Sequence, residues 1–300
     1  MTLNKQKLLQ TAGVAGTLFC IAVFASHPSF PTPDKLLLFF FFVFLIFNQA
    51  SAMLKRLLPF VALILAYESF RGVADSLNGH VNYTLAPRVD TFLFGSLPTV
   101  QLQNILWHGQ VSWYDFAFYV PYLLFFIMPL GLALLVWKTH EKQYWRVVST
   151  FLAVFFAGFL TFLLLPAAPP WMASQNDYIE PVTRISSGVW QALGIADFPS
   201  FYSRVSPNPV AAVPSLHAAI ATLFSIFIFK LYGRRWGAVS LIYPVLIYVG
   251  VVYQGEHYFF DILLGALYAV AGYKLVPKAA HRFKRLSLRA RPQLNLSSAP

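Results

Sequence analysis

The sequence predicts an all-α fold, a polytopic membrane bundle of about eight transmembrane helices. Composition is the first observation behind this prediction: of 300 residues, 58% are hydrophobic and only 11% are charged, whereas soluble domains carry about 25% charged residues. The second is a succession of apolar segments near the membrane-spanning length. The third is an uneven distribution of Lys and Arg between alternate connections.

Eight apolar segments approach the length of about 20 residues that a spanning helix needs. They cover residues 8–26, 36–54, 57–75, 116–137, 147–166, 208–229, 236–253 and 257–276. Short connections are predicted at 27–35, 55–56, 138–146 and 230–235. Two longer connections contain aromatic residues and Gly/Pro turn signals, so we expect structured loops or re-entrant pieces that cover one face of the bundle.

This order divides the chain into three parts. Two N-terminal helices occupy residues 1–56, a six-helix core with outer loops at 76–115 and 167–207 occupies residues 57–276, and a basic tail occupies residues 277–300. No internal repeat is visible, so a transporter built from inverted halves gains no support.

The charged residues predict the orientation. Threading eight helices places 17 of the 22 Lys and Arg, with Glu141 as the only acid, on the side of both termini. Cytoplasmic connections of membrane proteins carry such an excess, so both termini are expected in the cytoplasm. The basic tail is then expected to bind anionic lipid headgroups of the bilayer, and no nucleic-acid partner is expected.

Two histidines interrupt the apolar sequence at the same predicted depth, on the extracytoplasmic side. His217 lies in AAVPSLHAAIATL, and His257 lies in YQGEHYFFDILLG with Asp261 four residues later. Residues at i and i+4 share a helix face, so the carboxylate can hold one ring nitrogen and leave the other basic. Ionisable residues inside membrane segments indicate a functional site.

Several kinds of site can use two histidines. A lone imidazole can simply bond a neighbouring carbonyl, two can ligate haem iron, and two with one Asp can bind zinc. The sequence lacks the CxxCH and HExxH patterns that support the metal alternatives. Nucleophilic catalysis fits best: one imidazole attacks phosphorus, the Asp stabilises the imidazolium, and the second histidine protonates the leaving oxygen. We therefore expect no metal and no cofactor.

These residues resemble a known family. VPSLH at 213–217 and HYFFD at 257–261 are similar to the two histidine motifs of the type 2 phosphatidic acid phosphatase superfamily, membrane-embedded enzymes that work through a phosphohistidine. The branch with inositol phosphorylceramide and sphingomyelin synthases is the most similar. Its features appear in order as YESFRG (67–72), DTFLFGSLPTVQLQ (90–103), WYDFAFYVPY (113–122) and LLPAAPPWMA (164–173). The resemblance implies His257 as nucleophile, Asp261 as its orienting partner and His217 as acid and base.

The chain departs from the phosphatases of this superfamily in two places. They carry a KxxxxxxRP motif upstream, whereas the single match here runs from Lys284 to Pro292, after the histidines. They also carry an arginine six residues before the nucleophile, where this chain has Val251. Both departures are typical of the synthase branch and favour a transferase.

Cationic or N–H donors must neutralise the phosphate. Arg71, near the outer end of its helix, is the first candidate, although Glu68 at i−3 can pair with it instead. Ser215, at a helix start suited to anions, is the second. Arg184 and Arg204 are reserves.

The predicted activity is transfer of a phosphoryl-containing headgroup from a lipid phosphate or phospholipid. The alternatives are a lipid phosphate phosphatase, acting on phosphatidic acid or a polyprenyl phosphate, and a non-catalytic lipid transporter. A binding site gains nothing from a nucleophile with its own orienting carboxylate, which favours an enzyme. The donor, the acceptor and the oligomeric state are left open.

Overall fold

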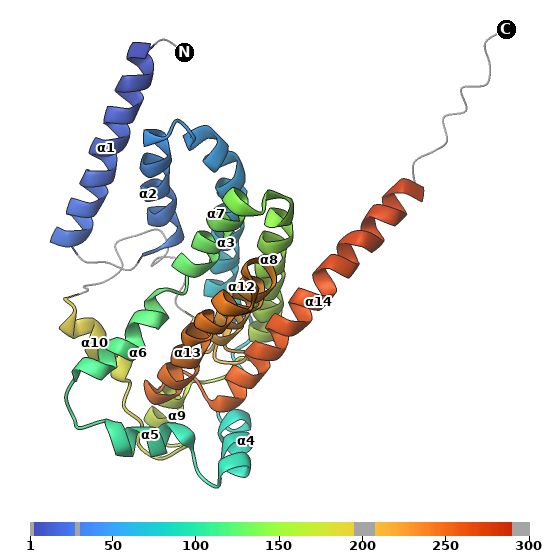
Figure 1. The fold of residues 1–300 in the computed structure, drawn as a ribbon. Helices are drawn as coiled ribbons and strands as arrows, with labels where there is room; N and C mark the ends of the chain where they lie inside the picture. Colours follow the sequence, from blue (N-terminus) through green and yellow to red (C-terminus); the bar gives the residue numbers. More distant parts are fainter. Residues whose placement is uncertain (1–2, 28–30, 195–207, 290–300) are drawn as a thin grey trace.

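The computed structural model describes residues 3–27, 31–194 and 208–289, and this part of the chain is helical, without a β-strand. The long helices lie side by side as a bundle (Figure 1). They are α1 (Leu3–Ser26), α2 (Pro33–Ile46), α3 (Ala50–Leu77), α6 (Trp113–Leu123), α7 (Ile127–Thr139), α8 (Tyr144–Leu164), α12 (Leu216–Ser240), α13 (Ile242–Tyr253) and α14 (Phe259–Arg289). The predicted fold class, a helical membrane bundle, is confirmed.

Within the described residues, five helices are long and apolar enough to cross a bilayer, and six if the bent pair α6 and α7 forms one span. The pair bends by 52° between Leu123 and Ile127. The other two predicted spans correspond to α2 and α13, which have 14 and 12 residues. A helix rises about 1.5 Å per residue, so either one alone is shorter than the hydrocarbon core of about 30 Å.

Two predicted connections have different outcomes. The prediction of a connection at 55–56 is wrong, because α3 begins at Ala50 and continues through these two residues. The chain turns earlier, at Asn48, which has a positive φ of 54°. The first predicted part therefore ends inside α3, and the three-part division stays a prediction. The connection at 230–235 is confirmed as a break, since Gly233 has a φ of 86° inside α12.

The two long connections contain short helices, most of them at the lower end of the bundle in Figure 1, with α10 (Ile185–Ala192) higher, beside α6. They are α4 (Leu85–Phe94), α5 (Pro98–Leu106), α9 (Pro170–Gln175) and α10 (Ile185–Ala192). A 3₁₀ turn, η1 (Glu141–Gln143), joins α7 and α8 at the other end. The expectation of structured loops on one face is confirmed for the described residues.

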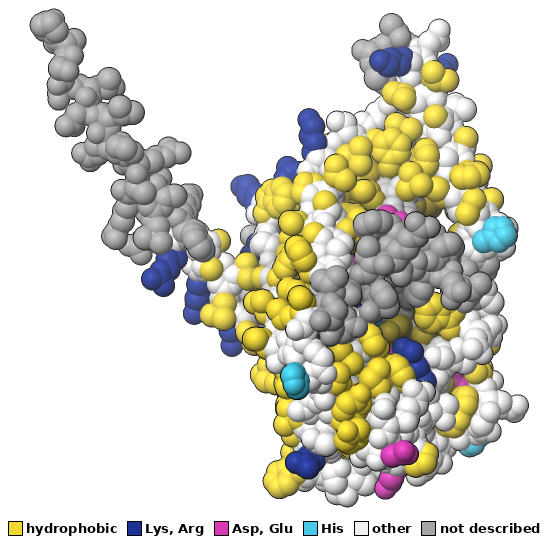
Figure 2. Space-filling view, turned by 180° about the vertical axis from the view of Figure 1, so that it is seen from behind, with side chains coloured by type: hydrophobic (Ala, Val, Ile, Leu, Met, Phe, Trp, Pro, Cys, Tyr) yellow, Lys and Arg dark blue, Asp and Glu magenta, His cyan; other side chains and the backbone are white. Residues whose placement is uncertain are grey.

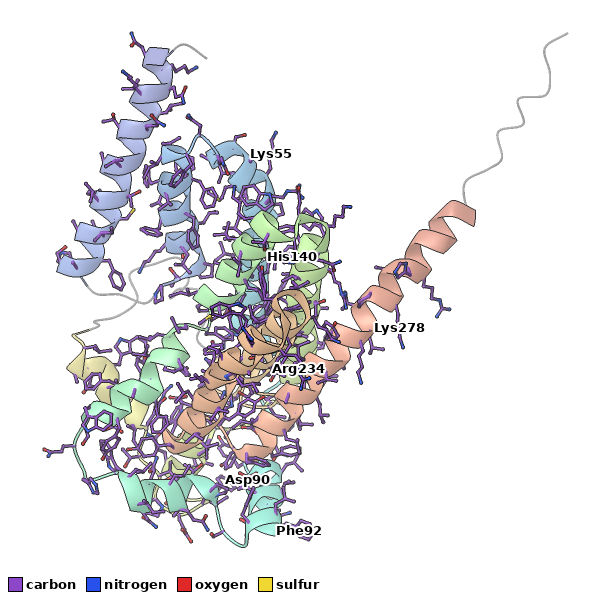
Figure 3. The ribbon with its side chains drawn as sticks, in the orientation of Figure 1. Lys55, Asp90, Phe92, His140, Arg234 and Lys278 are labelled. Carbon is purple, nitrogen blue, oxygen red and sulfur yellow. The ribbon has the colours of Figure 1, made fainter. Side chains whose placement is uncertain are left out.

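Apolar side chains cover much of the outside of the bundle (Figure 2). Lys55 and His140 lie in the upper part of Figure 3, whereas Asp90 and Phe92 lie at the lower end. In Figure 2, hydrophobic side chains are spread over much of the visible surface. On α1 the apolar window is only 6% buried by the protein, which leaves its side chains for lipid.

The core lies between α3, α7, α8, α12 and α14. Its fully buried side chains include Phe60, Tyr67, Phe155 and Phe227. Tyr67 packs on Phe155 with ring centroids 5.0 Å apart. This core fixes the positions of α12 and α14, which carry the two histidine motifs.

Candidate active site

His257 and Asp261 form a buried pair at the start of α14. His257 is 6% exposed, Asp261 is fully buried, and the ring Nδ1 lies 3.4 Å from the carboxylate Oδ2. The same Oδ2 accepts the backbone N–H of Tyr258 at 2.9 Å. A carboxylate held in this way can keep the proton on Nδ1 and leave Nε2 as the basic nitrogen. The predicted i+4 contact is present.

His217 enters the site from α12. Ser215 is the N-cap of this helix, and its Oγ accepts the N–H of Ala218 at 3.3 Å. The N–H of Ser215 donates to the backbone oxygen of Asp261 at 2.9 Å, which joins the two motifs directly. The rings of His217 and His257 have centroids 5.6 Å apart. The structure therefore brings the two predicted histidines together.

Gly265 allows the two helices to approach this closely. A Cβ at this position would lie 2.2 Å from the backbone oxygen of Ser215 and 3.2 Å from the Cβ of Ala218. Atoms do not approach to 2.2 Å without bonding, so any side chain here would push α14 away from α12. The absence of a side chain at Gly265 keeps His217 near His257.

Aromatic rings fix the orientation of the His217 ring. Tyr122 stacks on it with centroids 4.2 Å apart and planes 18° from parallel, and Phe125 lies at 4.6 Å. Tyr122 lies in the last turn of α6 and Phe125 lies in the bend between α6 and α7, so this part of the chain supplies the packing that holds His217. Among the described residues, no hydrogen-bond partner meets the Nδ1 of His217.

The two histidines line one cavity of about 140 Å³. This volume is smaller than the 300 Å³ or more of a site for a drug-sized ligand. Apart from the histidines, Glu68 and Arg71, the wall is made of Tyr67, Tyr122, Phe125, Phe126, Phe162, Trp190, Ala211 and Leu216.

Among the described residues of the cavity wall, Arg71 is the one cation. Its Nε donates to Oε2 of Glu68 at 2.9 Å, and Glu68 is 1% exposed while the Arg71 side chain is 19% exposed. Both roles weighed from the sequence are therefore compatible with its position: it pairs with Glu68 and it faces the cavity. The Nδ2 of Asn208 donates to the backbone oxygen of Arg71 at 2.9 Å and ties this helix end to the segment before α12.

Ser215 and Arg184 are absent from the described wall of the cavity. Ser215 is fully buried. Arg184 pairs with Glu256 at 2.8 Å and its guanidinium lies 4.4 Å from the centre of the Trp171 ring. Arg204 lies outside the described residues. A direct phosphate contact of Ser215 stays a prediction.

Glu256 makes side-chain contacts beside His257 that were not predicted from the sequence. Besides Arg184, it accepts a hydrogen bond from the Oγ of Ser186, the second residue of α10. Because Glu256 directly precedes His257, its contacts with Arg184 and Ser186 tie the start of α10 to the active-site turn. An ionisable residue adjacent to the histidine was the only signal in the sequence.

The donor set does not form a metal site in the part of the chain that the structure describes, where no group of three or more His, Cys, Asp or Glu converges. The pair His217 and His257 has one carboxylate, and that carboxylate bonds the His257 ring and the Tyr258 N–H. The geometry suits a nucleophile with an orienting acid rather than a ligand set.

Comparison with known proteins identifies relatives of this chain. Residues 89–275 match the family model described as the PAP2 superfamily. The chain is 33% identical over 162 residues to the phosphoinositol dihydroceramide synthase of Bacteroides thetaiotaomicron, covering 51% of this chain and 52% of that protein. It is 25% identical over 235 residues to the inositol phosphorylceramide synthase of Candida albicans, covering 74% of this chain and 48% of that protein. The chain thus spans about half the length of these relatives, and no solved structure matches it.

Proposed function

The chain belongs to the PAP2 superfamily, and on this basis we propose that it is a lipid phosphotransferase that works through a phosphohistidine at His257. One observation carries the proposal: the His257–Asp261 pair and His217 line or adjoin a single cavity, with ring centroids 5.6 Å apart. This is the arrangement that a nucleophile, its orienting acid and a proton donor require.

The reaction has two balanced halves. In the first, the lone pair of His257 Nε2 attacks the phosphorus, the bond from phosphorus to the leaving lipid oxygen breaks, and protonated His217 gives that oxygen its proton. In the second, neutral His217 takes the proton of an acceptor hydroxyl, whose oxygen attacks phosphorus as the P–N bond breaks. Asp261 stabilises the charge on His257 while it is bonded to phosphorus, and Arg71 offsets the charge on the phosphoryl oxygens.

Three features favour a transferase over a phosphatase. Both relatives are named as synthases of inositol-phosphate sphingolipids. Val251, at the position where the phosphatases carry an arginine, is 1% exposed and packs in an apolar cluster. The cavity wall is mainly aromatic and aliphatic, which helps to exclude water from the phosphohistidine. A phospholipid such as phosphatidylinositol is the proposed donor, with diacylglycerol as its leaving group, and ceramide is the proposed acceptor.

The proposed orientation places this site at the extracytoplasmic leaflet. His217 and His257 lie at the starts of α12 and α14. These starts lie near the end of the bundle that carries α4 and α5 (Figure 1). Lys55 lies toward the opposite end in Figure 3, and the positive-inside rule assigns the side that carries the basic connections to the cytoplasm.

Headgroup transfer by purified protein tests the function. Phosphatidylinositol is supplied with and without ceramide, and the lipids are separated and identified by mass spectrometry. We expect a new inositol-phosphate lipid that appears only with the acceptor and disappears in His257→Ala. Rapid release of free phosphate from phosphatidic acid, without dependence on an acceptor, would replace the transferase with the phosphatase alternative.

A further inference from the structure

A second buried carboxylate meets the start of α14. Asp90, on α4, is fully buried, and both of its oxygens accept backbone hydrogen bonds. Oδ2 accepts the N–H of Phe259 at 2.8 Å, and Oδ1 accepts the N–H of Phe260 at 2.9 Å. Figure 3 shows Asp90 at the lower end of the bundle, beside the beginning of α14.

These two N–H groups need a partner from outside their helix. The first four N–H groups of any α-helix have no intrahelical acceptor, and leaving them buried without one costs free energy. Asp261 satisfies the preceding N–H, that of Tyr258, at 2.9 Å. Two carboxylates, one on α14 and one on α4, therefore hold three consecutive N–H groups next to His257.

Packing holds α4 in place against α14. Phe94 meets the ring of Phe259 edge to face with centroids 5.0 Å apart. Tyr258, which is 1% exposed, belongs to one apolar cluster with Ala86 and Leu97. Asp90 is thus presented by a fixed element and not by a free loop.

The His257–Asp261 contact is sensitive to any shift of this turn. Its distance of 3.4 Å is at the long end of the hydrogen-bond range, so a small displacement of the first turn removes it. Asp90 does not line the cavity among the described residues and has no contact with the reacting atoms.

We propose that Asp90 is a positioning residue that holds the first turn of α14, so that Asp261 orients His257 for attack. The inference rests on the proposed role of His257. It assigns a function to the Asp of the DTFLFG segment, which acts through His257 and Asp261 and not on the substrate.

The test compares Asp90→Ala, Asp90→Asn and the matched control Thr91→Ala, an exposed neighbour on the same helix. Each variant is purified in detergent and checked for a monodisperse state. Its kcat and KM are then measured for headgroup transfer from phosphatidylinositol to ceramide. We expect Asp90→Ala to lower kcat roughly 10- to 100-fold with KM within about twofold, as for a lost positioning contact. Asp90→Asn keeps one oxygen acceptor and is expected to lie between Asp90→Ala and the wild type, and Thr91→Ala to equal the wild type.

A double-mutant cycle separates positioning from a loss of folding. If Asp90 acts through the His257–Asp261 pair, its substitution should matter little once Asp261 is already changed. The kcat of the double variant Asp90→Asn, Asp261→Asn should therefore be less than about twofold below that of Asp261→Asn alone. Losses that multiply, or a wild-type kcat in Asp90→Ala, would overturn the positioning role. Full activity of His257→Ala would instead reject the proposed function itself, so the two failures are distinguishable.

Discussion

The rings of His217 and His257 lie with centroids 5.6 Å apart and planes inclined by 59°, although His217 belongs to α12 and His257 to the turn before α14. Their proximity depends on the backbone contact from Ser215 to Asp261 and on the missing side chain of Gly265. The same two motifs that resemble a phosphohistidine enzyme are therefore also physically joined.

The first prediction concerns the chemical groups. His257→Ala, His217→Ala and Asp261→Asn should each reduce turnover by a factor of roughly 100 to 10,000, because nucleophile and proton donor each contribute that much. His108→Ala, at an exposed loop position, is the control and should be fully active. The initial rate of headgroup transfer is measured in detergent micelles, and an active His257→Ala would exclude the phosphohistidine.

The second prediction concerns the approach of α12 and α14. Gly265→Ala places a Cβ 2.2 Å from the oxygen of Ser215, so we expect kcat to fall at least about tenfold and stability by about 1–3 kcal/mol. Gly131→Ala on α7 is the matched control, because a Cβ there meets nothing within 4 Å. It should be neutral, or stabilising by up to about 1 kcal/mol. Thermal unfolding and kcat are measured together, and equal behaviour of the two variants would contradict the close-contact explanation.

The third prediction follows from the electrostatics of Asp90. Burial raises its pKa from 3.8 to about 6, with a smaller contribution from the charge of Asp261, while the hydrogen bonds from Phe259 and Phe260 oppose the increase. A raised folded-state pKa contributes stability that is complete below pH 3.8 and is lost as pH rises through 6. The side chain of Asp90→Asn does not titrate. As the pH rises from about 4 to 7, the unfolding free energy of the wild type should therefore fall relative to that of Asp90→Asn.

The shift between wild type and Asp90→Asn should reach up to about 3 kcal/mol, since one pKa unit corresponds to about 1.4 kcal/mol. Denaturant unfolding in detergent at several pH values measures it, with Thr91→Ala as the variant that should follow the wild type. A difference that stays constant over this pH range would show that Asp90 titrates as it does in the unfolded chain.

The fourth prediction concerns orientation. In a background with Cys20→Ser, single cysteines at His108 and Asn176 should react with an impermeant thiol reagent added to intact cells, whereas Lys142→Cys should react only after lysis. All three positions are exposed to the surroundings of the protein. Labelling of Lys142→Cys from outside would reverse the proposed topology and the outward-facing site.

The fifth prediction concerns metals. Chelators such as EDTA should leave the rate of headgroup transfer unchanged, because the two histidines, Asp261 and Arg71 supply the nucleophile, the proton and the charge. The assay compares chelated enzyme with enzyme to which Mg²⁺ or Zn²⁺ has been restored. A rate that falls with chelation and returns with metal would favour the metal alternative.

The sequence by itself determined the membrane bundle, the order of its helices and the paired histidine motifs. Apolar length and charge asymmetry are local properties of the chain. The four-residue spacing of His257 and Asp261 also predicted their contact, although His257 lies just before α14 and not inside it. The family resemblance carried by VPSLH and HYFFD is confirmed by the match over residues 89–275. The turn after α2 was predicted too late, at 55–56, because apolar residues continue on both sides of Asn48. The chain turns at Asn48, whose φ is positive.

The tertiary structure decided which side chains serve the motifs. Asp90 lies far from His257 along the chain, and only the packing of α4 on α14 brings its carboxylate to the N–H groups of Phe259 and Phe260. Likewise, the bend between α6 and α7 places Tyr122 against His217. Glu256, next to His257, contacts Arg184 and Ser186 at the start of α10. Such contacts follow from long-range packing of whole helices, which hydrophobic periodicity does not encode, since it records that a face is buried but not against which residue.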